Sequence, residues 1–270
     1  MSSGRRTLRA IVLGTQSFID GGTKVGAQYV AQALAAAGWR VDYVPSLSSP
    51  LDVIGHQRHG RLKRAWSSAS RAQEVEPGLM EWSAKALFPA HRLFLRFAWQ
   101  CHAFGCLLPE QLRKTRYDLC LTDVAPNMLL LRQLKARLRV CRVNDWPHGF
   151  GKDLHPVVMR EMAASLGGQV FDEMWAVSEP LLAYCQSLNT RAPIILMPNG
   201  VDERLLVPAQ RCPPRQSRSA VYVGGMTAWL DKSLLAAAAR LLPDWRFDVY
   251  GPGGVAGQDD PPNLHWCDSV

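Results

Sequence analysis

The chain has 270 residues, 47% of them hydrophobic and 20% charged. It is long enough for one large or two ordinary domains, and this composition excludes a disordered protein. No apolar run reaches the roughly 18–20 residues of a membrane-spanning helix. The seven cysteines form no C-x-x-C pair, and neither they nor the seven histidines have metal-ligand spacing. We therefore expect a globular cytoplasmic protein without a metal site.

The net charge of +8 is concentrated in one part of the chain. Residues 56–116 carry 11 basic and four acidic side chains, whereas residues 191–270 carry eight of each. A local excess of this kind indicates an anionic partner. Because no nucleic-acid-binding motif accompanies it, we expect no nucleic acid partner and favour an anionic membrane surface.

The first predicted unit is a strand at 9–13, a glycine-containing loop at 15–23, a helix at 25–37 and a strand at 40–44. The alanine-rich helix repeats apolar residues at helical spacing, and Gly38 is the residue type at which many helices end.

Strand and helix alternate again from residue 117 onward. The expected strands are 117–122, 138–143, 174–178 and 194–197, and the expected helices are 128–137 and 179–187. Repeated strand–helix units predict an open parallel sheet covered by helices on both faces, which is an α/β fold.

A run rich in proline and arginine at 207–218 predicts a linker. It separates a domain at 1–206 from a second region at 219–270. That region reads as strands at 220–223, 247–250 and 263–267 with a helix at 229–242. About 50 residues are few for an α/β domain, so we expect the second domain to be incomplete.

Asp145 follows the strand that ends at Val143 and precedes a break at Pro147. In an open parallel sheet, residues just past the strand ends face the ligand-binding crevice. Trp146 and Phe150 border this carboxylate, and partial desolvation would raise its pKa toward that of a general base. An ordinary loop or helix-cap aspartate fits the same spacing.

Two glycine-rich stretches are candidate phosphate-binding loops. The first contains Gly21, Gly22 and Lys24 and precedes a helix, where free backbone N–H groups favour anions. A flexible loop explains it equally well. The second, at 251–257, is followed by no helix and therefore predicts a surface turn.

The segment 85–108 mixes aromatic and aliphatic residues with Arg92 and Arg96, which would share one helical face. We predict a basic amphipathic helix that lies on an anionic membrane surface. The alternative is a core helix with a solvated basic edge.

Three motifs in sequence order resemble those of GT-B glycosyltransferases. They are Asn199-Gly-Val-Asp202 before the linker, Val223-Gly-Gly-Met226 at the start of the second region, and the run at 241–251. The resemblance is strongest to xanthan-type glucuronosyltransferases and related family-4 type enzymes. It implies two Rossmann-like halves, of which the second lacks the family's later strands and helices here.

The resemblance also implies an activity and its residues. Asp145 resembles the general base of that family, and Lys24 aligns with a basic residue before the first helix. The positions implied to contact the donor are Asn199, Gly224, Gly225 and Met226. The expected reaction moves a sugar from a nucleotide-sugar donor, UDP-linked, to a lipid-linked or saccharide acceptor at the inner face of the membrane, with no cofactor. The alternative is a non-catalytic remnant that binds a membrane or a partner protein.

Overall fold

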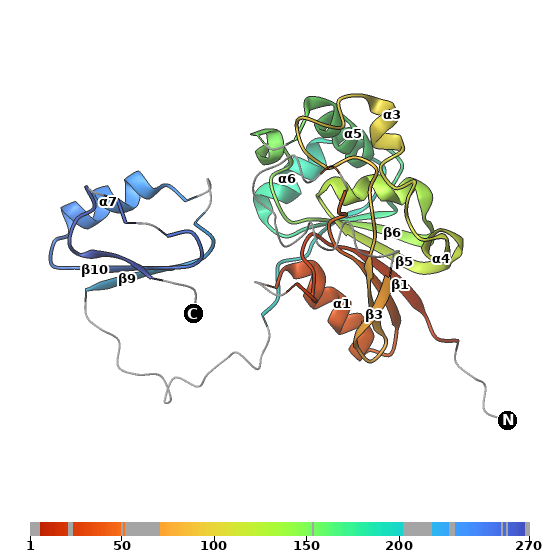
Figure 1. Ribbon diagram of the computed structural model, residues 1–270, viewed down its shortest axis with the longest axis horizontal. Helices are drawn as coiled ribbons and strands as arrows, with labels where there is room; N and C mark the ends of the chain where they lie inside the picture. The colour runs from red at the N-terminus through yellow and green to blue at the C-terminus, as the bar shows by residue number, and fades with distance from the viewer. Residues whose placement is uncertain are drawn as a thin grey trace. The chain divides into compact units, whose positions relative to one another are not determined.

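The computed structural model divides the chain into two compact units, residues 1–200 and 201–270 (Figure 1). The predicted linker lies outside the described residues except for Arg218. The structure describes residues 6–20, 24–49, 51, 71–152, 154–188, 190–201, 218–226, 230–254, 256–257 and 259–267.

The first unit is built on an eight-stranded sheet with the order β3-β4-β2-β1-β5-β6-β7-β8. Only the edge strand β3 is antiparallel to its neighbour, and the other paired strands are parallel. The strands are β1 (Arg9–Leu13), β2 (Arg40–Val44), β3 (Arg71–Glu76), β4 (Leu79–Ser83), β5 (Arg116–Asp123), β6 (Lys135–Val143), β7 (Glu173–Ala176) and β8 (Ile194–Leu196).

Helices cover both faces of this sheet (Figure 1). Successive residues of a strand point to opposite faces, so Ala10 and Val12 of β1 join one core and Ile11 and Leu13 join the other. The first core includes α1 (Gly26–Ala36) and the second includes α3 (Ala98–His102), α5 (Pro156–Gly167) and α6 (Glu179–Ser187). The described part of this unit also contains the short helix α4 (Glu110–Lys114) and the 3-10 helices η2 (Pro126–Gln133) and η3 (Pro147–Lys152).

The second unit contains a three-stranded parallel sheet, ordered β11-β10-β9. Its elements are β9 (Ser219–Val223), α7 (Lys232–Leu241), β10 (Arg246–Tyr250) and β11 (Leu264–Cys267). The Asp231 carboxylate caps α7 by accepting a hydrogen bond from the Leu234 backbone N–H at 2.9 Å. Alanines of α7 pack on Phe247 and Val249 of β10.

Two predicted helices are wrong. The helix expected at 128–137 is the 3-10 helix η2 followed by the start of β6 at Lys135. Lys135, Arg137 and Arg139 alternate with apolar residues, which is a strand pattern that the preceding leucine run obscured.

The amphipathic helix expected at 85–108 is also wrong. Within that range only Ala98–His102 is α-helical. Arg92 and Arg96 are exposed and flank a turn in which Leu95 is buried with a φ of 43°. A residue with left-handed backbone angles cannot continue an α-helix, so Leu95 interrupts the expected helix. Burial of the Leu95 side chain stabilises the turn.

Candidate functional site

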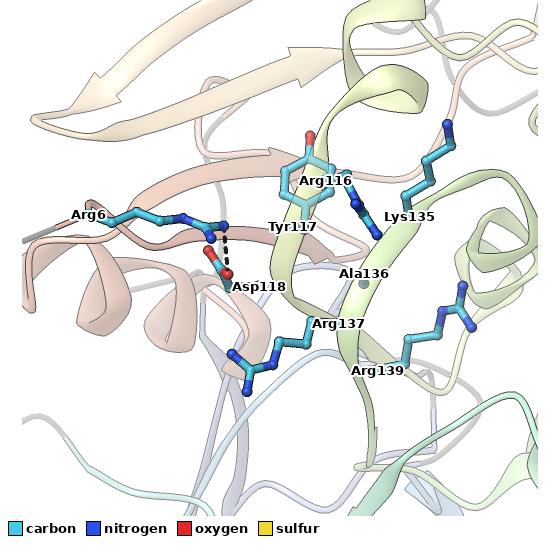
Figure 2. Close-up of a pocket in the computed structure, with 8 residues that line it drawn as sticks. All are labelled: Arg6, Arg116, Tyr117, Asp118, Lys135, Ala136, Arg137 and Arg139. Carbon is cyan, nitrogen blue, oxygen red and sulfur yellow. Dashed lines mark hydrogen bonds and ion pairs between the residues drawn. The ribbon is translucent and has the colours of Figure 1, made fainter.

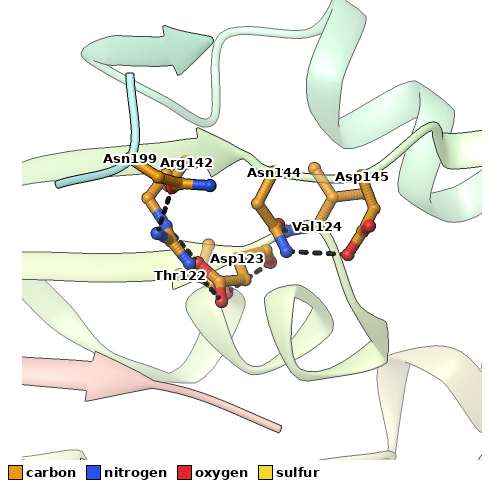
Figure 3. A network of polar contacts seen from close by, with 7 residues as sticks. All are labelled: Thr122, Asp123, Val124, Arg142, Asn144, Asp145 and Asn199. Atoms are coloured by element: carbon orange, nitrogen blue, oxygen red, sulfur yellow. Dashed lines mark hydrogen bonds and ion pairs between the residues drawn. The ribbon is translucent and has the colours of Figure 1, made fainter. Parts of the chain in front are cut away.

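Polar side chains gather at the carboxyl ends of the parallel strands of the first unit (Figure 3). Asp123 ends β5, Arg142 lies one residue before the end of β6, and Asn144 and Asp145 follow that strand. Asn199 follows β8. The carboxyl edge of an open parallel sheet is where α/β proteins bind ligands.

A buried ion pair between Asp123 and Arg142 lies at the bottom of this site. Arg142 Nε donates to Asp123 Oδ1 at 2.8 Å and Nη2 donates to Oδ2 at 3.0 Å. The exposed fractions are only 2% for Asp123 and 6% for Arg142. A two-point contact of this kind fixes both side chains, and removal of either would leave a buried charge without its partner.

Arg142 also contacts two further parts of the chain. Its Nη1 donates to Asn199 Oδ1 at 3.2 Å. A Cβ atom on Gly26, the first residue of α1, would lie 1.9 Å from Arg142 Nη1. The guanidinium therefore occupies the space that a side chain at position 26 would need, which explains the glycine at the start of the helix.

Asp145 is oriented by its neighbour Asn144. Asn144 Oδ1 accepts the Val124 backbone N–H at 3.3 Å, and Asn144 Nδ2 donates to Asp145 Oδ2 at 2.8 Å. The residue is exposed, but protein atoms remove part of the hydration of its carboxylate, and this desolvation raises the pKa of Asp145. The negative charge of Asp123 raises this pKa further, and Arg142 offsets part of the shift. A carboxylate with a raised pKa is a stronger base at neutral pH.

Aromatic rings lie next to this carboxylate. Trp146 packs against Tyr184 with ring centroids 4.9 Å apart and against His148 at 5.9 Å, and 48% of the tryptophan surface remains exposed. His155, which is also near in sequence, instead caps α5 by accepting the Val157 backbone N–H at 3.2 Å. The aromatic group of Trp146, His148 and Tyr184 therefore begins one residue after Asp145 and leaves part of the tryptophan surface open.

The loop after β1 is held by the buried side chains of Asn127, Tyr43 and Glu81. Asn127 Nδ2 donates to the carbonyl oxygens of Gly14 at 2.7 Å and Pro45 at 3.0 Å. The Tyr43 hydroxyl donates to the Gln16 carbonyl at 2.7 Å. Burial and the charge of Glu81 raise the pKa of Tyr43, so this hydroxyl keeps its proton.

Glu81 holds the next part of the same loop. It accepts hydrogen bonds from the Ser17 hydroxyl at 2.5 Å and from the Phe18 backbone N–H at 2.6 Å. These contacts fix the path of the chain from the end of β1 to Asp20.

Two of the three predicted phosphate-loop residues, Gly21 and Gly22, lie outside the described residues. Lys24 lies along α1, where its Nζ donates to Gln32 Oε1 at 3.4 Å and sits 5.8 Å from the centre of the Tyr29 ring. None of these contacts connects Lys24 to Asp145.

Gly224, Gly225 and Met226 form the turn after β9 in the second unit. The Gly224 N–H donates to the Tyr250 carbonyl at 3.0 Å, and the Met226 N–H donates to the Pro252 carbonyl at 3.4 Å. A Cβ atom on Gly251, whose φ is +150°, would lie 1.9 Å from the Gly224 carbonyl oxygen. The turns after β9 and β10 therefore pack closely, which requires glycine at 251.

The structure thus places the predicted site residues in two groups. Asp145 and Asn199 belong to one polar network in the first unit, and residues 224–226 form one turn in the second. Asp123 and Arg142 were not predicted as site residues. Each is a charged residue near the end of an apolar strand, and this position was the signal that could have identified them. Among the described residues, no group of three or more His, Cys, Asp or Glu side chains is arranged to hold a metal ion.

Comparison with solved structures identifies the fold. No protein-family model matches the sequence, and no curated protein matches it either. The structure is similar to sucrose-phosphate synthase from Thermosynechococcus elongatus, with a TM-score of 0.69 and 17% identity over 98% of this chain and 71% of that chain. It is also similar to TarM, with a TM-score of 0.54 and 8% identity over 98% and 77% of the two chains.

Similarity at these identities establishes the fold alone. The chain has an α/β fold of the GT-B type with a second Rossmann-like region, and this part of the sequence prediction is confirmed. The specific resemblance to xanthan-type glucuronosyltransferases stays a prediction, and so does the incompleteness of the second Rossmann-like half.

Proposed function

We propose that the protein is a glycosyltransferase that moves a sugar from a nucleotide-sugar donor, UDP-linked, to a hydroxyl group of a glycolipid or polysaccharide precursor. The observation that carries this proposal is the placement of Asp145. In a GT-B-type fold, its carboxylate stands at the carboxyl edge of the first sheet, is oriented by Asn144 and has a raised pKa. These properties suit a general base for an acceptor hydroxyl.

The proposed reaction is a direct displacement with inversion. Asp145 takes the proton of the acceptor hydroxyl as that oxygen forms a bond to the anomeric carbon of the donor. The bond from this carbon to the diphosphate oxygen breaks, and its electron pair leaves with the nucleoside diphosphate. Donor contacts are assigned to Asn199 and to the turn of Gly224, Gly225 and Met226. Backbone N–H groups of the loop with Gly21, Gly22 and Lys24, before α1, favour anions, so this loop is assigned to a phosphate or the acceptor.

Measurement of nucleoside diphosphate release tests this function. Wild-type protein is incubated with a panel of UDP-sugars and lipid-linked or saccharide acceptors, and Asp145→Asn is compared with it. Loss of a general base lowers the rate by roughly 10²–10⁴-fold, so we expect a loss in this range. Asp244→Asn removes an exposed carboxylate of the second unit and serves as the matched control, with activity retained.

Wild-type turnover by Asp145→Asn would rule out the base assignment. If no donor is turned over while membrane binding persists, the non-catalytic alternative is favoured.

A membrane-bound acceptor is supported by one exposed surface of the first unit. Leu93, Phe97 and Trp99 are 64%, 59% and 58% exposed, and the exposed Arg92 and Arg96 are interleaved with them. Apolar side chains beside basic ones suit an anionic membrane surface, here proposed as the inner face of the cell membrane. Among the described residues no helix is long and apolar enough to span a bilayer, so the proposed contact is peripheral.

Vesicle sedimentation tests the membrane contact. Each basic side chain near an anionic surface contributes about 1 kcal/mol, so Arg92→Glu with Arg96→Glu weakens binding to anionic vesicles by at least about 30-fold. Arg160→Glu with Arg191→Glu makes the same charge change elsewhere and is the control. Equal loss in both variants would show that net charge, and not this surface, drives binding.

A further inference from the structure

A second polar region lies at the opposite edge of the first sheet. The amino ends of β5 and β6 line a cavity of about 760 Å³ (Figure 2). Strand β6 runs nine residues from this edge to the carboxyl edge, which is a distance of about 25 Å. The cavity is therefore separate from Asp145. Its charged lining residues are Arg6, Arg116, Asp118, Lys135, Arg137 and Arg139.

Strand pairing explains why so many cations meet here. Lys135, Arg137 and Arg139 alternate with apolar residues along β6, so three of the lining cations come from one strand. The register of β5 with β6 pairs Arg116 directly with Lys135. Like charges at adjacent positions of neighbouring strands destabilise a sheet unless a counter-ion is present.

The carboxylate of the cavity is already engaged by other groups. Asp118 accepts hydrogen bonds from Arg6 Nη2 and from the Arg9 backbone N–H, each at 3.0 Å. Figure 2 shows Arg6 turned toward Asp118. Five cations against one carboxylate leave an excess of four positive charges in the cavity.

The remaining cations have unused hydrogen-bonding capacity. Within the described part of the chain, the side chains of Arg116, Lys135 and Arg137 make no hydrogen bond or ion pair. Arg139 donates Nη2 to the Leu134 carbonyl at 3.3 Å, but its buried Nε has no partner among these residues. A buried N–H without an acceptor is unfavourable, and a bound anion would satisfy it.

We propose that this cavity binds a ligand that carries two or more phosphate groups. Four of the five cations are arginines, whose planar guanidinium groups bind phosphate oxygens through paired hydrogen bonds. The volume lies within the range of small-molecule sites and accommodates a diphosphate together with an attached group. The ligand is a free phosphorylated compound or the headgroup of a phospholipid, which share this chemistry.

Calorimetric titration of the full chain with pyrophosphate at low salt tests the site. We expect saturable binding that weakens as salt is added. The exposed pair Arg116→Gln with Arg137→Gln should weaken binding by at least about tenfold, because two charged hydrogen-bonding groups are lost. Arg160→Gln with Arg191→Gln makes the same charge change at exposed positions outside the cavity and should leave pyrophosphate affinity unchanged.

Vesicles containing cardiolipin, whose headgroup carries two phosphate groups, distinguish the two ligand sources. Weaker vesicle binding by the cavity variant than by wild type identifies a headgroup site. Unchanged vesicle binding with lost pyrophosphate binding identifies a free phosphorylated compound. The proposal is overturned if pyrophosphate fails to bind saturably or if both double variants lose equal affinity for pyrophosphate. It is also overturned if the cavity variant keeps the wild-type affinity. These measurements need no sugar transfer, so their outcome is independent of the proposed activity.

Discussion

The sheets of the two units differ in how their faces are covered. In the first unit, Ile11 and Val12 are neighbours in β1, point to opposite faces, and are both fully buried. In the second unit, β10 buries Phe247 and Val249 under α7, whereas Val221 and Val223 of β9 are 62% and 73% exposed. The candidate base therefore stands on a sheet packed from two sides, and the predicted donor turn follows a strand whose valines are exposed. Packing of this kind predicts higher local stability for the first unit.

The largest expected effect concerns the buried ion pair of the first unit. Arg142→Met leaves the Asp123 carboxylate buried without its partner and should lower the free energy of unfolding by about 3–5 kcal/mol. Urea unfolding measures the change in the free energy of unfolding, and hydrogen exchange of the native protein measures the local change in β5 and β6. In the second unit, Arg246→Met breaks a pair whose arginine side chain is 55% exposed, and we expect a smaller effect.

A double variant separates lost charge pairing from general disruption. Asp123→Asn combined with Arg142→Met removes both charges, so it should recover part of the stability that Arg142→Met loses. Equal losses in the single and double variants would contradict the role assigned to the pair.

The second prediction compares one substitution on the two sheets. Val12→Thr buries a hydroxyl group in the core under α1 and should cost about 1–3 kcal/mol. Val223→Thr places the same hydroxyl on an exposed strand face, where the change should stay within about 0.5 kcal/mol. Thermal unfolding of both variants measures the difference. If Val223→Thr proved as costly as Val12→Thr, the β9 face would be covered in solution.

Regular elements were predictable from sequence where their period was clear. The strands at 9–13 and 40–44 and the helix at 179–187 have the predicted bounds, because apolar periodicity and a glycine or proline define each of them. The hairpin of β3 and β4 was not predicted. Its first strand is largely polar and lies at a sheet edge, so it carries no alternating apolar signal.

The parts of the site that depend on strand pairing could not be predicted in the same way. Asp145 was accessible because its position after one strand is a local property. The pair of Asp123 with Arg142 and the adjacent cations Arg116 and Lys135 both follow from the register between β5 and β6. Sequence gives each strand but not their register, so neither feature was visible before the strands were placed side by side.

The smallest expected effect concerns Asp145 itself and has the opposite sign to the others. Its pKa is raised in the folded protein, so folding disfavours the ionised form. The linked stability is fully present below the unfolded-state pKa and is lost as pH rises through the higher folded-state pKa. Above this window, Asp145→Asn removes the penalty, and its Oδ1 can still accept the hydrogen bond from Asn144.

Asp145→Asn should therefore increase the free energy of unfolding slightly at neutral pH, by no more than about 0.5 kcal/mol, and leave it unchanged in acid. Urea unfolding of wild type and variant across this pH range measures the difference. A stabilised variant that has lost turnover is the pattern expected where a residue is retained for chemistry at the expense of stability. A variant destabilised at neutral pH would instead identify Asp145 as a structural residue of the loop after β6.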